Sequence, residues 1–212
     1  HIRREKATSN ICTAQSLLAI ISSFYALYHG YEGLNNIAKN IVILRSYLEQ
    51  GLLKLGFALN QCVRFDSFDV YSPNSSAIHK SALEHGFNFR ILPLGAEIDN
   101  ASGFGISIDE LSDIDEIHKI LNCIADVIDK KIDFEEIERE NLYDLDGIPL
   151  REEKFLQQSV FEDYRSETDL MRYIFSLAEK DFSLVDGMIP LGSCTMKLNA
   201  AAELSPLSWK NF

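Results

Sequence analysis

Apolar residues near the N-terminus recur at alternating intervals of three and four, which is the spacing of a helix with one buried stripe. The pattern predicts a helix that starts at about Asn10 and stops at Gly30. A second helix is predicted over 34–48, with Gly51 just beyond its end. The stripe of the first helix consists of Ile11, Ala14, Leu18, Ile21, Tyr25 and Tyr28.

After Gly56 the pattern changes to short segments separated by turn residues. Ser75 or Ser76 is a candidate N-cap for a helix that Gly86 closes, and Ser112 is a candidate N-cap for a later one. The alternation of strand-like and helix-like segments predicts a small α/β domain over about 52–125. Its elements are a strand over 68–71, a helix over 77–85, strands over 89–92 and 104–108, and a helix through 114–124.

The segment 126–146 has more acidic than basic residues, and Gly147-Ile148-Pro149 closes it. We interpret it as a solvated helix followed by a linker. Helical spacing returns over 167–178. The segment 188–197 has no clean period and is rich in small polar residues, which is typical of an ordered loop.

Composition excludes several classes of function. The 212 residues carry a net charge of −12, which argues against a nucleic-acid surface. No apolar run is long enough to span a bilayer, so no membrane partner is expected. The cysteines at 12, 62, 123 and 194 form no CxxC pair, and the histidines show no metal-binding spacing. We therefore predict an acidic, soluble protein of a reducing compartment without a metal site.

The stretch 189–199 reads IPLGSCTMKLN. A glycine followed by Ser193, Cys194 and Thr195 places small donors on backbone that can approach a ligand closely. Lys197 can neutralise a carboxylate or a phosphate. Chemistry alone favours a simpler interpretation, a loop before a helix cap with Lys197 exposed.

The same stretch resembles, nearly letter for letter, a signature of the P-protein family of the glycine cleavage system. Three other stretches are similar to the family in the same order, namely 1–15, 105–110 and 164–173. The resemblance therefore covers the whole chain, although its middle part is looser. It implies an internal segment of a longer polypeptide.

The family resembles a tandem of two aminotransferase-type (fold type I) halves, each with a large α/β domain and a small one. The resemblance implies that this chain contains the small C-terminal-type domain of the first half, with a long connecting helix before it and a helical linker after it. The expected segments are 1–51 for the connecting helices, 52–125 for the small α/β domain, 126–160 for the acidic linker, and 161–212 for the leader into the second half.

The resemblance also implies an activity. The family decarboxylates glycine with pyridoxal phosphate, whose ring accepts the electrons that carbon dioxide leaves behind, and passes the aminomethyl group to the lipoyl arm of H-protein. The lysine that binds the cofactor covalently is expected outside this chain. We assign no catalytic residue, and we expect the chain alone to be inactive. Cofactor-pocket lining is carried over to Ser193, Cys194, Thr195 and Lys197, although Cys194 can equally be a small buried apolar residue.

Expected partners are H-protein and the remaining halves or subunits of the enzyme, as a dimer, in a bacterial cytoplasm or a mitochondrial matrix. Asp109 and Glu110 precede a helix, where acids favour the helix dipole, and receive no catalytic role. The chain departs from the family pattern at Gln157, Gln158, Glu162 and Arg165, so these positions are left out of the site. The alternative is a stand-alone α/β module that binds a regulator or a partner. A complete minimal aminotransferase is excluded, because the chain is too short for a large cofactor domain.

Overall fold

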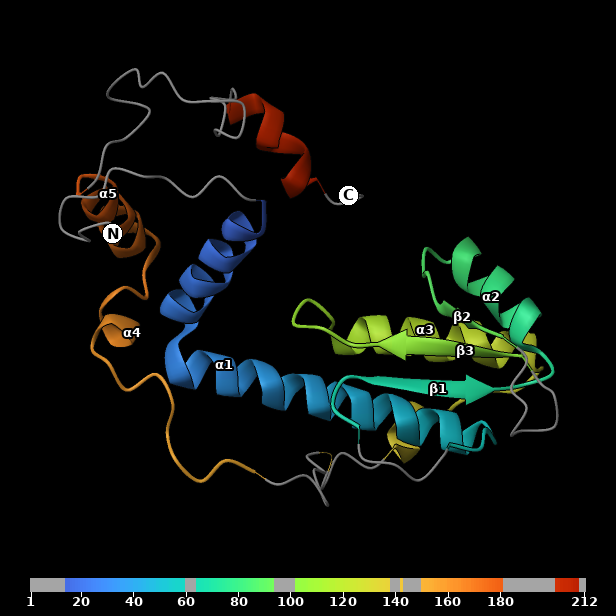
Figure 1. Ribbon diagram of the computed structural model, residues 1–212. Helices are drawn as coiled ribbons and strands as arrows, with labels where there is room; N and C mark the ends of the chain where they lie inside the picture. The colour runs from blue at the N-terminus through green and yellow to red at the C-terminus, as the bar shows by residue number, and fades with distance from the viewer. Residues whose placement is uncertain are drawn as a thin grey trace. The chain divides into compact units, whose positions relative to one another are not determined.

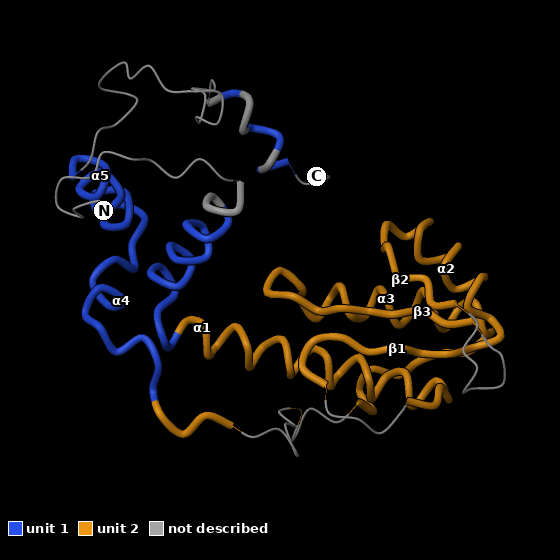
Figure 2. The backbone as a smooth tube through the Cα atoms, in the orientation of Figure 1, with its two compact units in different colours: residues 1–32, 154–212 blue, residues 33–153 orange. Residues whose placement is uncertain are grey.

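The computed structural model describes residues 14–59, 64–93, 102–137, 142, 150–180 and 201–209 (Figure 1). The chain divides into two compact units, which Figure 2 colours separately: unit 1 comprises 1–32 and 154–212, and unit 2 comprises 33–153. The elements in order are α1 (Ala14–Lys54), β1 (Ser67–Tyr71), α2 (Ser75–Glu84), β2 (Arg90–Leu92), β3 (Gly103–Ser107), α3 (Ile114–Val127), the 3-10 helix η2 (Phe134–Glu136), α4 (Val160–Asp163), α5 (Glu167–Ala178) and the 3-10 helix η3 (Ala201–Ser208).

Gly30 interrupts α1, as the sequence predicts. Its backbone has φ 59° and ψ −169°, a conformation that side-chain-bearing residues rarely adopt. A Cβ at this position would lie 2.6 Å from the carbonyl oxygen of Phe161 and 2.7 Å from a guanidinium nitrogen of Arg165. Conformation and space therefore both require glycine here.

The prediction that Gly51 lies beyond the second helix is wrong, because α1 continues to Lys54. A Cβ on Gly51 would lie 2.5 Å from a methyl carbon of Leu121 in α3. The glycine therefore serves close packing between two helices and does not end one. The glycine that ends α1 is Gly56, which has φ 89°; its amide donates to the Leu53 carbonyl at 2.9 Å, and the Phe57 amide donates to the Leu52 carbonyl at 3.0 Å. The Lys130 ammonium also donates to the Leu55 carbonyl at 2.5 Å.

The three strands form an antiparallel sheet in the order β1-β3-β2. This confirms the predicted strands and the strand-helix-strand-strand-helix order. One face of the sheet buries Phe68, Val70, Phe104 and Ile106. On the other face Arg90 pairs with Asp69 across the intervening Gly105, where a Cβ would lie 2.8 Å from the Arg90 Nε and 2.9 Å from the Asp69 carboxylate.

The core of unit 2 joins the later part of α1, α2, α3 and the buried face of the sheet. The start of α3 differs from the prediction. Its N-cap is Asp113, whose carboxylate accepts from the Glu116 amide at 2.8 Å, and not Ser112. The N-cap of α2 is Asn74, and neither Ser75 nor Ser76 has that role. The mixture of helices and a small antiparallel sheet agrees with the predicted class, and the fold type I assignment stays a prediction.

The solvated helix predicted within 126–146 is wrong for the described residues there, 126–137 and 142. After α3 they contain only the 3-10 helix η2. Phe134 stacks on His118 with ring centroids 4.0 Å apart, and Ile137 is 2% exposed. Two apolar residues among the acidic ones, Phe134 and Ile137, thus hold this segment on the core.

In unit 1, α5 has the predicted bounds, and Ser166 caps it by accepting from the Asp169 amide at 3.1 Å. The segment before α5 contacts the region of the Gly30 break. Tyr31 packs edge-on against Phe155 at 4.9 Å, and Arg165 lies 3.4 Å from the Glu32 carboxylate. Within the described ranges, no helix is both long and apolar enough to cross a bilayer.

Candidate functional site

The residues carried over as cofactor lining, Ser193, Cys194, Thr195 and Lys197, lie outside the described residues, in the gap 181–200. Their assignment therefore stays a prediction. Other lysines can be examined for the desolvated setting that a covalent cofactor lysine needs. Every lysine with a described environment is exposed; these are Lys39, Lys54, Lys80, Lys119, Lys130, Lys131, Lys154 and Lys180. The described part of the chain thus does not supply a fitting lysine for pyridoxal phosphate.

Two hollows flank the loop between β3 and α3, which carries the family-like stretch 105–110. The larger has a volume of about 480 Å³ and lies between this loop and the segment 86–90. The smaller, of about 270 Å³, lies between the loop and the α1 residues Ile37, Asn40, Ile43 and Leu44. Asp109 and Ser112 line both hollows, so the loop is the candidate binding element of unit 2.

The Asp109 carboxylate shapes this loop. Its Oδ1 accepts from the Leu111 amide at 2.9 Å, the Ser112 amide at 3.1 Å and the Ser112 hydroxyl at 3.1 Å. These three hydrogen bonds tie the side chain to the turn that leads into α3. Asp109 therefore holds the loop in place.

The lining of the hollows offers groups for binding. Arg90 lines the larger one and is already paired with Asp69. Across the described ranges, no three His, Cys, Asp or Glu side chains come together as a metal site requires. The residues that line the two hollows thus offer apolar contact, hydrogen bonds and the charges of Arg90, Asp109 and Glu116.

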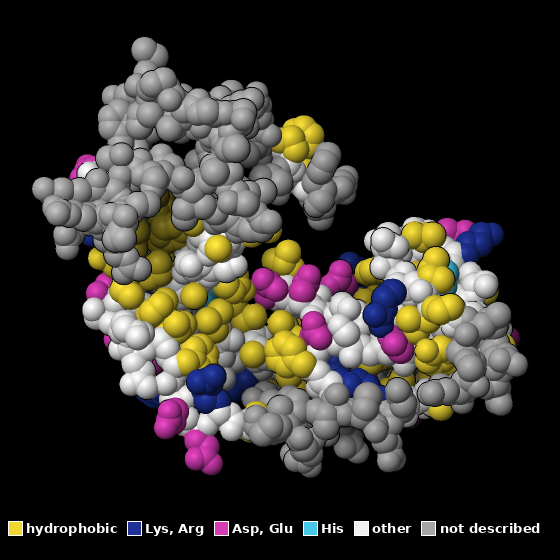
Figure 3. Space-filling model, in the orientation of Figure 1, with side chains coloured by type: hydrophobic (Ala, Val, Ile, Leu, Met, Phe, Trp, Pro, Cys, Tyr) yellow, Lys and Arg dark blue, Asp and Glu magenta, His cyan; other side chains and the backbone are white. Residues whose placement is uncertain are grey.

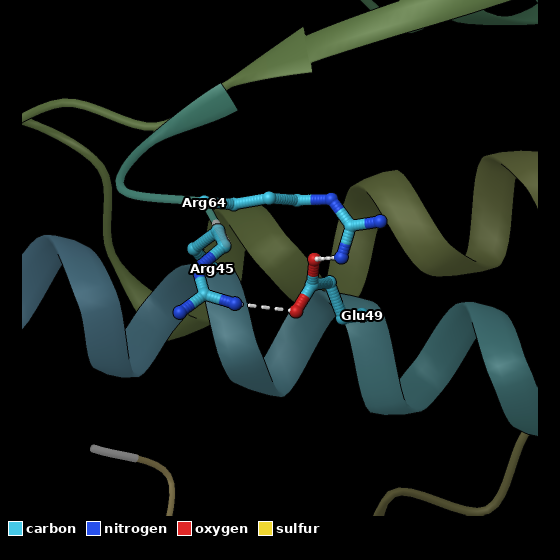
Figure 4. A network of polar contacts seen from close by, with 3 residues as sticks. All are labelled: Arg45, Glu49 and Arg64. Atoms are coloured by element: carbon cyan, nitrogen blue, oxygen red, sulfur yellow. Dashed lines mark hydrogen bonds and ion pairs between the residues drawn. The ribbon is translucent and has the colours of Figure 1, made fainter. Parts of the chain in front are cut away.

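A buried polar network links α1 to the segment before β1 (Figure 4). Glu49 accepts from Arg45 at 2.5 Å and from Arg64 at 2.8 Å, and the three side chains are 13%, 7% and 10% exposed, respectively. Arg45 and Glu49 have the i, i+4 spacing that the sequence could reveal, whereas Arg64 comes from a distant segment. Sequence reasoning missed this network.

Cys123 is buried in the core of unit 2 and contacts Ser81, whose hydroxyl lies 3.3 Å from the thiol sulfur. Burial raises the pKa of the thiol; the hydrogen bond to Ser81 opposes this shift and the Asp126 charge reinforces it. A raised pKa in the folded state means that the unfolded chain ionises first as the pH rises. The protonated thiol therefore adds to the stability of the folded chain at neutral pH. This added stability is lost as the pH rises from the ordinary thiol pKa through the raised pKa of the folded state.

We therefore expect iodoacetamide at pH 8 to label Cys123 about a hundredfold more slowly in the native chain than in urea, because only the accessible thiolate reacts. Peptide-resolved mass spectrometry measures each cysteine separately. The two rates are compared on the same Cys123 peptide, taken from the native chain and from the fully unfolded chain. Equal native and unfolded rates would contradict the buried position.

Arg165 is one of the positions left out of the predicted site. Its Nε donates to the Phe161 carbonyl at 3.2 Å, and its guanidinium pairs with Glu32. The side chain thus supports the packing around Gly30 within unit 1.

Comparison with known proteins bears on the whole chain. The family model described as glycine cleavage system P-protein matches residues 1–124. Glycine dehydrogenase (decarboxylating) of a strain of Prochlorococcus marinus is 54% identical over 213 residues, covering 100% of this chain and 22% of that protein. The protein of the same name from Psychromonas ingrahamii is 46% identical over 217 residues, with the same coverages. The chain thus spans about a fifth of the length of these curated relatives, and it belongs to the glycine cleavage system P-protein family.

Proposed function

We propose that this chain works as part of a glycine dehydrogenase (decarboxylating). The observation that carries the proposal is the 54% identity over 100% of the chain to a protein of that name, together with the family match. The reaction is decarboxylation of glycine with pyridoxal phosphate, followed by transfer of the aminomethyl group to the lipoyl arm of H-protein. We place the enzyme in a bacterial cytoplasm, since the relatives named above come from bacteria.

Pyridoxal phosphate supplies an electron sink for the carbon chemistry when it is bound. The described lysines are exposed and do not fit this cofactor, so we derive no step through the group here. We propose that the cofactor lysine belongs to another part of the enzyme, and that Ser193, Cys194, Thr195 and Lys197 line the pocket. We also propose a dimer and the segments 1–51, 52–125, 126–160 and 161–212 as connecting helices, small domain, linker and leader.

We expect no lysine of the isolated chain to be labelled selectively when it is mixed with pyridoxal phosphate and reduced with borohydride. An exposed lysine lacks the desolvation that lowers its pKa and makes it a good nucleophile, so labelling should be weak and spread over many lysines. Mass spectrometry of the digested chain locates the added mass. Efficient labelling of one lysine would contradict the placement of the cofactor lysine elsewhere.

The activity itself is tested in a chimera. The matched 213 residues of the Prochlorococcus marinus relative are replaced by this chain, and glycine-dependent release of carbon dioxide is measured with lipoylated H-protein. Activity that returns in the chimera, and not in the relative lacking the segment, supports the proposal. An inactive but folded chimera contradicts it. A stand-alone regulatory module is less favoured, because the relatives carry this segment inside a much longer enzyme.

A further inference from the structure

Unit 1 has almost no core of its own in the described part of the chain. Of the 24 buried apolar residues there, 23 belong to unit 2, and only Leu27 belongs to unit 1. Helix α5 buries no residue at all. A unit of this size needs a hydrophobic core to be stable, so its apolar surface is expected to pack on something else.

The exposed apolar surface of unit 1 is organised. Leu18, Ile21, Tyr25 and Tyr28 are 67%, 54%, 37% and 40% exposed, and their spacing of three and four places them on one face of α1. We call these four residues the α1 stripe. In Figure 3 hydrophobic side chains gather over the region that the N-terminal part of α1 occupies in Figure 1. A contiguous patch of this kind marks an interaction surface.

The polar residues between the stripe positions do not oppose burial. The Ser22 hydroxyl donates to the Leu18 carbonyl at 2.9 Å, and the Ser23 hydroxyl donates to the Ala19 carbonyl at 2.8 Å. Both hydroxyls are therefore satisfied within the helix. An apolar partner can cover this face without leaving a hydroxyl donor unpaired.

We propose that the α1 stripe is a docking face for the P-protein polypeptide that the relatives carry outside the matched segment. This inference rests on the proposed function, since it assumes that the chain acts within the larger enzyme. The matched segment is 22% of the relative's length, so most of that polypeptide is available to cover the stripe. Polypeptide joined to the same chain has an effective concentration in the millimolar range, which favours it over a second copy of this chain.

The test uses binding and not activity. The 212-residue chain, carrying an affinity tag, is mixed with the rest of the Prochlorococcus marinus relative expressed without the matched segment. We expect the chain to capture it, and the stripe variant Leu18→Glu/Ile21→Glu to capture it at least roughly a hundredfold more weakly, because two carboxylates would be buried without partners. The matched control is Leu53→Glu/Leu83→Glu, at positions of unit 2 that are 54% and 65% exposed. The control should bind as the unchanged chain does.

Light scattering across a wide range of concentration tests the second-copy alternative. The proposal is overturned if the chain forms a stripe-dependent dimer that persists when the relative's polypeptide is in excess. It is also overturned if the unchanged chain fails to capture that polypeptide, or if the stripe variant captures it fully. Cooperative thermal unfolding of unit 2 serves as the folding check, and Leu18→Ser/Ile21→Ser replaces the glutamate pair if that transition is lost. If the unchanged chain captures the relative's polypeptide but the folded chimera has no activity, the proposed function is overturned and this inference stands.

Discussion

Replacing Glu49 with glutamine should lower the free energy of unfolding by about 3 kcal/mol, because it removes the negative charge that two buried guanidinium groups share. The glutamine has nearly the same shape, so packing changes little. Its amide nitrogen, however, must face a guanidinium donor of Arg45 or Arg64, where the native carboxylate accepts on both sides. The cost is therefore electrostatic and is concentrated where α1 meets the segment before β1.

Urea unfolding followed by far-ultraviolet circular dichroism measures this loss. The matched control is Glu84→Gln, since Glu84 also pairs with a cation one helical turn away, Lys80, but on an exposed surface. The control should change the free energy of unfolding by less than about 0.5 kcal/mol. Equal small effects at both positions would show that the buried network contributes no more than a surface pair.

Replacing Phe104 with alanine should cost about 3 to 5 kcal/mol of the free energy of unfolding. The ring is fully buried in the central strand, and it lies 5.7 Å from Phe89, 6.1 Å from Phe57 and 6.5 Å from His79, measured between ring centroids. Its removal leaves a cavity that three other rings border. Domains of this size are stable by only about 5 to 15 kcal/mol. The Phe104→Ala variant therefore loses a large share of its stability and should unfold at a moderate temperature.

Ile91 provides the comparison for Phe104. The two residues are partners in the register of β2 and β3, yet Ile91 is 74% exposed. Ile91→Ala should change the thermal midpoint by only a few degrees, since little apolar area is lost from the core. If Ile91→Ala is as destabilising as Phe104→Ala, the aromatic cluster is not the centre of the core.

Much of unit 2 could be predicted from the sequence, because its elements have local signals. The alternation predicted a strand over 68–71, within the observed β1, and in unit 1 the helical period in 167–178 likewise corresponds to α5. Gly51 shows the limit of such signals. A glycine near a helix end is a normal stop, and only Leu121, in a helix far along the chain, reveals that the position serves packing.

The prediction for the segment 126–146 failed for a related reason. Its acidic residues suggest a solvated helix, but the apolar anchors Phe134 and Ile137 decide its path through contacts with the core. The candidate site was limited in another way. The hydrogen bonds that shape the loop at Asp109 are local, and the loop lies in the family-like stretch 105–110. The hollows beside it could not be predicted, because their other walls come from α1 and from the segment 86–90.

The glycines of β3 restrict how this protein can be engineered. Sequence-based stabilisation commonly replaces glycine in a strand with valine or threonine, which favour extended backbone. At Gly103 the added Cβ would lie 2.6 Å from the Val70 carbonyl oxygen, and at Gly105 it would displace the ion pair that crosses the strand. The central strand is thus a poor target for consensus-style design, and improvements are better sought on the outer strands and the helix surfaces.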